Sequence, residues 1–366
     1  MTARKTGISL YPGLYNSREE IMAALERAAS FGVTEVFTSL HIPEANPGIM
    51  LADCQAMGRR AQELGLRITA DVAPVSFDRL GASVDRLEPF VGLGLGGLRA
   101  DYGFSLQDLV RLANNPLGLK LVLNASSIRE ELVKDLLQAG VKPERLEACH
   151  NFYPRRESGL AWRYFLSQST MLKEAGIEVA AFVASRRNRR AVMYEGLPTV
   201  ETHRGLTPAR AAEELWATGV VDIVYVGDPL TPEDELAGLA RVAGRDHLEL
   251  RLRVAGELSQ MEREILFTNV HTQPWSEFAY VIRARGARQT TSGPQVLPRN
   301  TVPRPRGTVT IDNVSYARFA GELQITLVDL PPDPRVNVVG HILPEDLPLL
   351  ERIGPGGRFG FREIAE

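Results

Sequence analysis

The sequence contains very few cysteines. Cys54 and Cys149 are the only two in 366 residues, and they lie far apart along the chain. Such a pair excludes the disulfide framework of small secreted domains and a cysteine-based zinc site. The length is sufficient for one large domain and a small one, and 44% hydrophobic residues is an ordinary share for a soluble globular protein.

An excess of charge of either sign is also missing. The 42 Lys and Arg residues nearly balance the 45 Asp and Glu residues, giving a formal net charge of -3. We therefore expect no general attraction to nucleic acid or to an anionic membrane. No apolar run approaches the ~20 residues of a membrane helix, and the polar start MTARKTGISLYPG does not resemble a signal peptide. These features predict a cytoplasmic protein.

Up to about residue 243 the sequence alternates short apolar runs with longer amphipathic stretches. The expected strands are 7–10, 33–38, 66–71, 98–101, 119–123, 146–150, 177–183 and 220–226. The expected helices are 17–32, 47–64, 78–91, 105–113, 128–139, 160–175, 208–218 and 232–242. Eight such units are typical of a (β/α)8 TIM barrel with parallel strands. A doubly wound sheet is the competing architecture, but no glycine-rich phosphate fingerprint follows the first strand.

Beyond residue 245 the pattern becomes β-rich. Short apolar runs occur at 247–254, 278–283, 308–311 and 322–327, with Gly and Pro between them. Many short strands with little helix predict a small β-barrel or sandwich. We place the boundary near Gly244, which gives an N-terminal domain of residues 1–243 and a C-terminal domain of residues 244–366.

Polar residues follow every expected strand of the first domain. In a TIM barrel the active site lies at the C-terminal ends of the strands, so these residues are candidates for chemistry. Some of them will instead be helix caps or salt bridges, and Asp228, which precedes a proline and a helix, is the first candidate for a cap. The full set is Tyr11, His41, Glu44, Asp71, Arg99, Asp101, Asn124, His150, Asn151, Tyr153, Arg155, Glu195, Glu201, His203, Arg204 and Asp228.

The segment 195–204, EGLPTVETHR, carries the densest group of these residues. Two carboxylates, an imidazole and a guanidinium fall within ten positions, and its Gly and Pro prevent a long helix or strand. Functional side chains often lie on such loops. The alternative is a solvated surface loop whose charges pair with each other.

The residue types along this rim suit more than one chemistry. Two carboxyl groups flanking a glycosidic bond are the usual equipment of a glycosidase. Carboxylates together with His41, His150 and His203 could instead hold a divalent metal, although these histidines lack the helical spacing of a metalloprotease site. Arg155, Arg156 and Arg204 predict an anionic group on the substrate, because guanidinium groups bind phosphate or carboxylate in a bidentate manner.

Taken in order, several motifs resemble those of the MupG-type 6-phospho-N-acetylmuramidases. They are GISLYP, FTSLHIPE, LRADYGFS, LNAS, HNFYPRRESGL, YEGLPTVETHR and VGDP. The tail TVTIDNVSYARFAGELQITLVDLPPDPRVNVVGHI is similar to the cyclophilin-like β-barrel domain of that family. The likeness covers nearly the whole chain. The segment 190–193 and a linker rich in Pro and Arg depart from the pattern.

The resemblance implies a cytoplasmic glycoside hydrolase of cell-wall recycling. Its substrate would be a disaccharide of 6-phospho-N-acetylmuramic acid and N-acetylglucosamine, with no cofactor and no metal, and a homodimer remains open. Among the four candidate catalytic residues, the general acid would be Glu44 or Glu201, and the second carboxylate Asp71 or Asp101. The other rim residues would bind substrate: the arginines would bind the phosphate and the lactyl carboxylate. Substrate-assisted attack by the acetamido group is an alternative to a protein nucleophile.

Two other classes of function compete with this one. A TIM barrel does not fix function, so the chain could be a non-catalytic phosphosugar-binding protein. It could also be a metal-dependent sugar isomerase or epimerase, whose activity a chelator would abolish.

Overall fold

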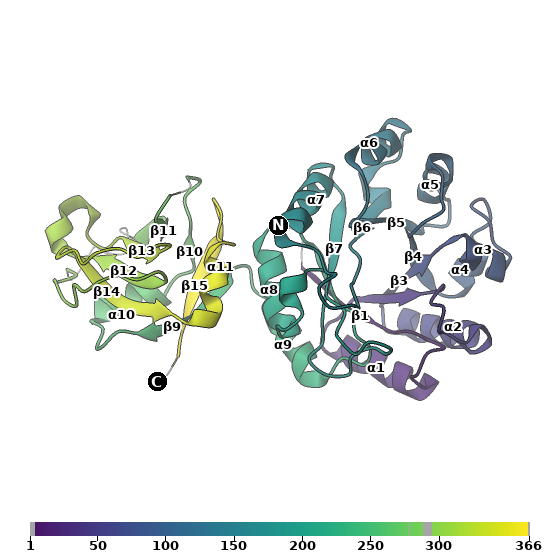
Figure 1. The fold of residues 1–366 in the computed structure, drawn as a ribbon, viewed down its shortest axis with the longest axis horizontal. Helices are drawn as coiled ribbons and strands as arrows, with labels where there is room; N and C mark the ends of the chain where they lie inside the picture. The colour runs from purple at the N-terminus through teal and green to yellow at the C-terminus, as the bar shows by residue number, and fades with distance from the viewer. Residues whose placement is uncertain (1–3, 277, 288–294, 365–366) are drawn as a thin grey trace. The chain divides into compact units, whose positions relative to one another are not determined.

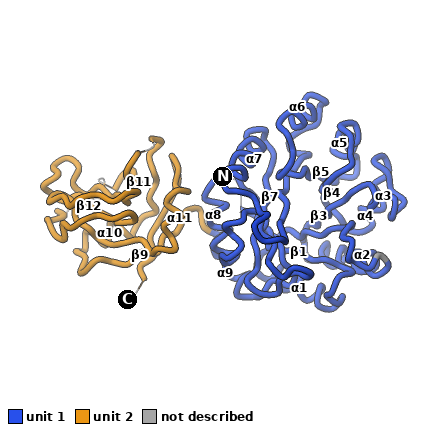
Figure 2. Tube along the Cα trace, in the orientation of Figure 1, with its two compact units in different colours: residues 1–244 blue, residues 245–366 orange. Residues whose placement is uncertain are grey.

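The computed structural model describes residues 4–276, 278–287 and 295–364. The chain forms two compact units, Met1–Gly244 and Arg245–Glu366, shown in different colours in Figure 2. Within the described residues, no helix combines the length and the apolar character needed to span a membrane.

The first unit is built around a closed barrel of eight parallel strands in the order β1 to β8 (Figure 1). β1 pairs with β2 on one side and with β8 on the other, which closes the sheet. The strands are β1 (Lys5–Ser9), β2 (Glu35–Ser39), β3 (Arg67–Val72), β4 (Leu95–Ala100), β5 (Lys120–Asn124), β6 (Leu146–Cys149), β7 (Glu178–Val183) and β8 (Ile223–Val226). The predicted TIM barrel is confirmed.

Helices follow the strands along the chain. They are α1 (Arg18–Ser30), α2 (Pro47–Glu63), α3 (Pro74–Leu80), α4 (Glu88–Gly92), α5 (Leu106–Ala113), α6 (Glu130–Gln138), α7 (Trp162–Glu174), α8 (Pro208–Ala217) and α9 (Glu233–Ala243), with short 3-10 turns η1 (Pro143–Arg145) and η2 (Glu201–His203). The single helix predicted at 78–91 is wrong. It is two short helices, because Gly81 ends α3 in the left-handed conformation at φ 60°.

The fourth strand begins earlier than predicted, at Leu95 instead of Leu98. Its glycines hid it, since Gly is depleted in strands. The structure explains one of them: a Cβ on Gly97 would lie 2.9 Å from Thr69 Oγ1 on the neighbouring strand. Gly97 therefore allows β4 to approach β3 closely, which matters for the site below.

Aromatic side chains fill the middle of the barrel. The ring centroids of Phe37 and Phe182 lie 4.9 Å apart, and Tyr225 stacks on Phe182 at 5.4 Å. Gly7 makes room for Tyr225, because a Cβ at position 7 would lie 2.2 Å from the Tyr225 ring. This layer is a packed core and gives a rigid base to the strand ends above it.

A buried ionic network occupies the N-terminal end of the barrel interior. Arg67 donates from Nε to Glu35 at 2.8 Å and from Nη2 to Glu147 at 2.6 Å. Glu35 and Glu147 are both buried. None of these three residues was among the candidates predicted from the sequence.

The second unit contains a seven-stranded sheet in the order β10-β15-β9-β14-β12-β13-β11. Its pairs are antiparallel except β9 with β15. The predicted β-rich domain is confirmed, although the capped helix α10 was not expected. The elements are β9 (Leu248–Val254), α10 (Gln260–Phe267), β10 (His271–Thr272), β11 (Val281–Arg283), β12 (Thr308–Asp312), η4 (Val314–Phe319), β13 (Leu323–Thr326), β14 (Val336–Ile342), η5 (Pro344–Asp346), α11 (Leu347–Leu350) and β15 (Arg358–Glu363).

Candidate active site

The C-terminal ends of β3 and β4 bring two carboxylates and a buried arginine together. Asp71 and Arg99 are paired in register on the two strands, and Asp101 follows β4. Residues two apart on a strand share a face, so Arg99 and Asp101 extend toward the same region. Arg99 Nη1 donates to Asp71 Oδ1 at 2.6 Å and to Asp101 Oδ1 at 3.4 Å. One guanidinium thus bridges both acids.

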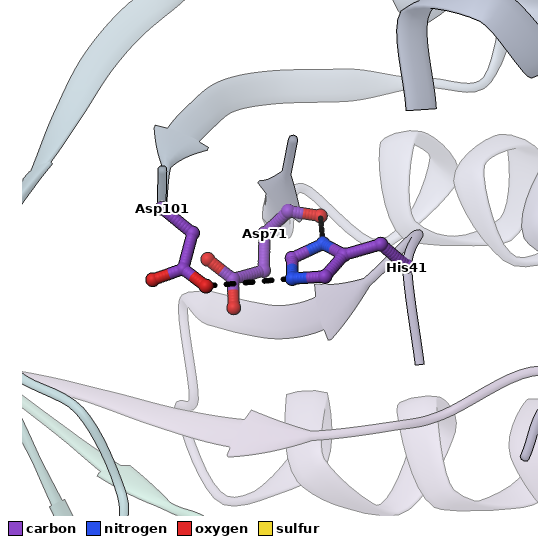
Figure 3. A group of neighbouring side chains, drawn as sticks. All are labelled: His41, Asp71 and Asp101. Carbon is purple, nitrogen blue, oxygen red and sulfur yellow. Dashed lines mark hydrogen bonds and ion pairs between the residues drawn. The ribbon is translucent and has the colours of Figure 1, made fainter. Parts of the chain in front are cut away.

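His41 joins these acids from the loop after β2 (Figure 3). Its Nε2 lies 3.5 Å from Asp101 Oδ2, and its Nδ1 lies 3.4 Å from the main-chain oxygen of Asp71. The Tyr102 ring packs edge-on against the imidazole, with centroids 5.9 Å apart. The loop and both strands therefore fix the position of the imidazole.

Two asparagines extend the network. Asn124, at the end of β5, donates from Nδ2 to Asp101 Oδ1 at 3.1 Å. Arg99 donates from Nη2 to Asn151 Oδ1 at 2.6 Å and from Nε to the Cys149 carbonyl at 3.1 Å. Six rim residues chosen from the sequence therefore meet in one connected cluster: His41, Asp71, Arg99, Asp101, Asn124 and Asn151.

The two carboxyl groups of this cluster have opposite proton affinities. Burial raises the pKa of Asp71, and this effect outweighs the lowering by Arg99. The hydrogen bond with His41, aided by the charge of Arg99, lowers the pKa of Asp101. The same bond raises the pKa of His41. Adjacent acids whose environments separate their pKa values are characteristic of acid–base sites.

The cluster also has the residue types of a metal site. His41, Asp71 and Asp101 each offer a ligand atom, and these atoms lie within 4.8 Å of one another; it is the single such group found in the described residues. However, Arg99 already donates to both carboxylates and supplies a positive charge between them. A divalent cation would have to bind against this guanidinium, whose like charge opposes it. The contacts favour chemistry by the side chains themselves.

Glu201 has a different surrounding from the one expected of a general acid. Arg204 donates to it from Nε at 2.7 Å and from Nη2 at 2.6 Å, and the amides of Glu157 and Gly159 donate at 2.9 and 2.7 Å. These bonds, with that of Arg204 first, lower the pKa of Glu201 to about 2. A carboxylate so strongly ionised cannot donate a proton near neutral pH, so we withdraw Glu201 as general acid.

Arg204 is engaged in the same way. Its Nη1 donates to the carbonyls of Tyr153 and Gly196 at 3.0 and 3.1 Å, and its Nη2 donates to that of Arg155 at 3.1 Å. Arg204 therefore joins the loops after β6 and β7 and has little capacity left for a substrate anion. We reassign the pair Glu201–Arg204 as a clamp between these loops.

Two of the candidate histidines are structural. His150 is fully buried, with Ser126 Oγ 3.2 Å from its Nδ1 and Ser169 Oγ 3.0 Å from its Nε2, and burial lowers its pKa to about 3. His203 is also buried, with its Nε2 3.3 Å from Glu214 and its ring beside Trp162. Neither can reach a substrate, so both are withdrawn from the candidate site.

Other predicted residues serve the loops. Asp228 is buried and accepts hydrogen bonds from the amides of Ser185, Arg190 and Leu197 at 2.9, 2.9 and 3.2 Å, so it acts as a cap and does not face substrate. Glu195 pairs with Arg156 at 2.5 Å. The side chain of Arg155 is exposed, and Tyr153 is half-buried.

Two cavities lie on the other side of the rim. The first, which we call the β7 cavity, has a volume of about 200 Å³ and is formed by loops after β1, β7 and β8, including Asn16, Asn188, Arg189, Arg190 and Tyr194. The second, the Glu44 cavity, has a volume of about 250 Å³ and shares Arg190 with the first. Glu44, retained as a candidate, lines this second cavity.

Arg190 is a site residue that the sequence analysis missed. Its guanidinium carbon lies 4.7 Å from the Tyr11 ring centroid and 4.8 Å from that of Phe152. Tyr11 itself is buried and donates its hydroxyl to the Gly227 carbonyl at 2.7 Å, so it supports Arg190 and is not free to stack on a sugar. Four arginines between positions 186 and 190 signalled a basic segment, but not which one would face the cavities.

The fold and the site define a TIM-barrel protein with an acid–base cluster and arginine-containing cavities on its C-terminal rim. A family model described as 6-phospho-N-acetylmuramidase, N-terminal, matches residues 6–241, and the corresponding C-terminal model matches residues 248–362. The chain belongs to the 6-phospho-N-acetylmuramidase family, which confirms the resemblance seen in its motifs.

Two solved structures are similar over almost the full length. An uncharacterized B. cereus protein is 33% identical, with a TM-score of 0.86, and the match covers 98% of this chain and 99% of that one. A conserved Enterococcus faecalis protein of unknown function is 34% identical, with a TM-score of 0.67, and the match covers 98% and 96% of the two chains. Comparison with curated proteins gave no match.

Proposed function

We propose that this protein is a glycoside hydrolase that cleaves the bond between 6-phospho-N-acetylmuramic acid and N-acetylglucosamine. Its products are the phosphorylated muramic sugar and free N-acetylglucosamine, and its place is in the cytoplasmic recycling of cell-wall fragments. The family membership and the composition of the rim support this proposal: carboxyl groups for bond cleavage and arginines for the anionic sugar.

The observation that carries the proposal is the pair Asp71 and Asp101 with opposite pKa shifts. Asp71, whose pKa is raised, is the general acid that protonates the leaving oxygen. Asp101, whose pKa is lowered, is the ionised carboxylate that stabilises the positive charge developing on the sugar ring. Burial of Asp71 and the hydrogen bond between His41 and Asp101 set these two charge states apart, whereas Arg99 lowers the pKa of both acids. Glu44 is the alternative general acid, because it lines the cavity that Arg190 also lines.

The neighbouring polar groups suit an amino sugar. Asn124 and Asn151 lie beside the two acids and have amide groups for hydroxyl or acetamido contacts. Tyr153, in the loop after β6, is half-buried, and we assign it to contact with a sugar ring. Attack by the acetamido group of the substrate would leave Asp101 to orient and stabilise that group.

The test is incubation of the purified protein with the phosphorylated disaccharide, with release of N-acetylglucosamine as the measurement. Asp101→Asn should lower kcat by at least about 1000-fold, because a neutral amide cannot stabilise the transition-state charge. An unchanged rate in Asp101→Asn would overturn the assignment of this residue.

Two controls address the competing functions. Dialysis against a chelator should leave this hydrolysis unchanged, whereas loss on chelation and recovery with a divalent metal would show that the reaction needs a metal, for which His41, Asp71 and Asp101 are the candidate ligands. Conversion of the sugar without release of N-acetylglucosamine, abolished by the chelator, would favour the isomerase or epimerase. Tight binding of the disaccharide without any hydrolysis would favour the non-catalytic binding protein.

A further inference from the structure

We propose that the β7 cavity is the subsite that binds the phosphate of the substrate, and that the guanidinium of Arg190 is the group that recognises it. The identity of the anion as a sugar phosphate rests on the proposed function. The preference of this cavity for an anion rests on its own contacts.

The lining of the β7 cavity has positive charge and hydrogen-bond donors, and Asp228, whose charge interacts with Arg189, lies outside this lining. Arg189 and Arg190 line it together with the amide side chains of Asn16 and Asn188, and no described Asp or Glu is among its lining residues. A concave site with two guanidinium groups and no carboxylate attracts an anion and repels a cation. Phosphate fits this chemistry better than a neutral hydroxyl.

The Arg190 guanidinium has no ion pair among the described residues, whereas Arg99, Arg156 and Arg204 on the same rim each pair with a carboxylate. No described carboxylate pairs with it, and its buried Nη1 has no hydrogen-bond partner. Its main contacts are the rings of Tyr11 and Phe152. A guanidinium held against aromatic rings keeps its planar N–H edge for an acceptor, and a phosphate presents oxygens at the matching spacing.

Asp228 fixes the segment that carries Arg190. Its carboxylate accepts hydrogen bonds from the Ser185, Arg190 and Leu197 amides, so the segment between β7 and η2 folds around it. Because these amides occupy Asp228, it holds the backbone of Arg190 without neutralising its side chain. Loops after the seventh and eighth strands are also a frequent place for phosphate binding in TIM barrels.

The other arginines of the rim are less suited to this role. Arg204 is saturated by Glu201 and main-chain carbonyls, and Arg156 pairs with Glu195. Arg190 is in addition common to the β7 cavity and the Glu44 cavity. A phosphate bound by Arg190 in the first cavity would leave the sugar attached to it room in the second.

The experiment compares hydrolysis of the phosphorylated and the unphosphorylated disaccharide by the full-length native protein, Arg190→Gln and Arg187→Gln. Arg187 is the matched control, since it lies on the same segment, pairs with Asp234 and lines neither cavity. Arg190→Gln should lower kcat/KM about 100-fold on the phosphorylated disaccharide and less than about 3-fold on the unphosphorylated one. Arg187→Gln should leave both unchanged. Equal losses on both substrates, or no loss, would overturn the proposal.

A binding measurement separates this proposal from the proposed function. In calorimetry, the native protein should bind N-acetylmuramic acid 6-phosphate and N-acetylglucosamine 6-phosphate more tightly than their unphosphorylated forms, and Arg190→Gln should remove that preference. This result would support the subsite even if no disaccharide is cleaved. An effect of Arg190→Gln confined to sugars with the lactyl carboxylate would overturn the phosphate assignment. If Arg190→Gln does not fold, Arg190→Lys, which keeps the positive charge, replaces it in both experiments.

Discussion

His41 and Asp101 stabilise each other in their charged forms, and this mutual effect sets the protonation state of the candidate site. The hydrogen bond between them is the largest contribution that lowers the pKa of Asp101 and raises the pKa of His41. An ionised Asp101 is what the proposed chemistry requires. His41 is therefore a positioning residue whose removal should be visible in a pH profile.

We predict that His41→Gln shifts the acid limb of the kcat/KM profile upward by about one pH unit. The pKa of Asp101 is lowered in the native protein, so its ionised form persists as the pH falls; without the imidazole, Asp101 takes up a proton at a higher pH. The measurement is kcat/KM on the phosphorylated disaccharide between pH 3.5 and 7. A lower plateau with an unmoved acid limb would mean that His41 contributes only to structure.

Glu201 should behave in the opposite way, because its bonds join loops. Glu201→Ala removes the acceptor of Arg204 and of the Glu157 and Gly159 amides, and we predict a loss of about 1–2 kcal/mol in the free energy of unfolding. We expect kcat to fall less than about 10-fold, since the carboxylate is not a proton donor. Urea denaturation and kinetics test both points, with Asp101→Asn as the contrasting variant. A 1000-fold loss of kcat with normal stability would restore Glu201 as a catalytic residue.

At the scale of elements, β3 and β4 hold the two acids close together. One carboxylate oxygen of Asp71 and one of Asp101 lie within 4.8 Å of each other. Such a close pair resembles the roughly 5–5.5 Å separation of the carboxyl groups in retaining glycosidases more than the roughly 6.5–9.5 Å in inverting ones, which leaves room for an attacking water. We therefore predict that the first product keeps the anomeric configuration of the substrate, through either a carboxylate or an acetamido nucleophile. Proton NMR of the early products tests this prediction, and an inverted first anomer would contradict the pairing of Asp71 with Asp101.

The elements also show what the sequence could and could not predict. Alternation of strands and helices was enough for the barrel, because the strands are largely buried and most of them read as short apolar runs. The same pattern predicted that Asp71, Arg99, Asp101 and Asn124 lie at the ends of neighbouring strands. Because these strands are parallel, their C-terminal ends bring the four residues together. The pattern failed for His150 and Glu201, because which side chains a loop buries or saturates depends on contacts between loops that lie far apart in the chain.

At the scale of the whole barrel, charged networks occupy both ends of an apolar middle. The C-terminal end holds the candidate site. The N-terminal end holds Glu35, Arg67 and Glu147, and beside them Lys5 donates to Glu178 at 2.8 Å. Burial raises the pKa of Glu35 to about 7, with Glu147 raising it further and Arg67 opposing. The stability of the barrel should therefore depend on pH at the end opposite the candidate site.

We predict that the native protein loses stability relative to Glu35→Gln between pH 5 and pH 8, by on the order of 2 kcal/mol. The folded pKa of about 7 lies above the ordinary value of 4.5, so the folded state binds more protons between these values. The stabilisation is complete below pH 4.5 and is lost as the pH rises through 7. Urea denaturation at several pH values measures the difference.

Glu178→Gln is the matched control at the same end of the barrel. Burial opposes the change, but the hydrogen bond and charge of Lys5, together with Lys120, lower the pKa of Glu178. A carboxylate whose pKa is lowered in the folded state stabilises the fold at pH values above its ordinary pKa. This stabilisation is lost only as the pH falls toward the pKa of the folded state. The difference between the native protein and Glu178→Gln should thus be constant from pH 5 to pH 8. If the stability difference from the native protein stays constant with pH for Glu35→Gln as well as for Glu178→Gln, Glu35 is ionised from pH 5 to pH 8 and forms a full ion pair with Arg67.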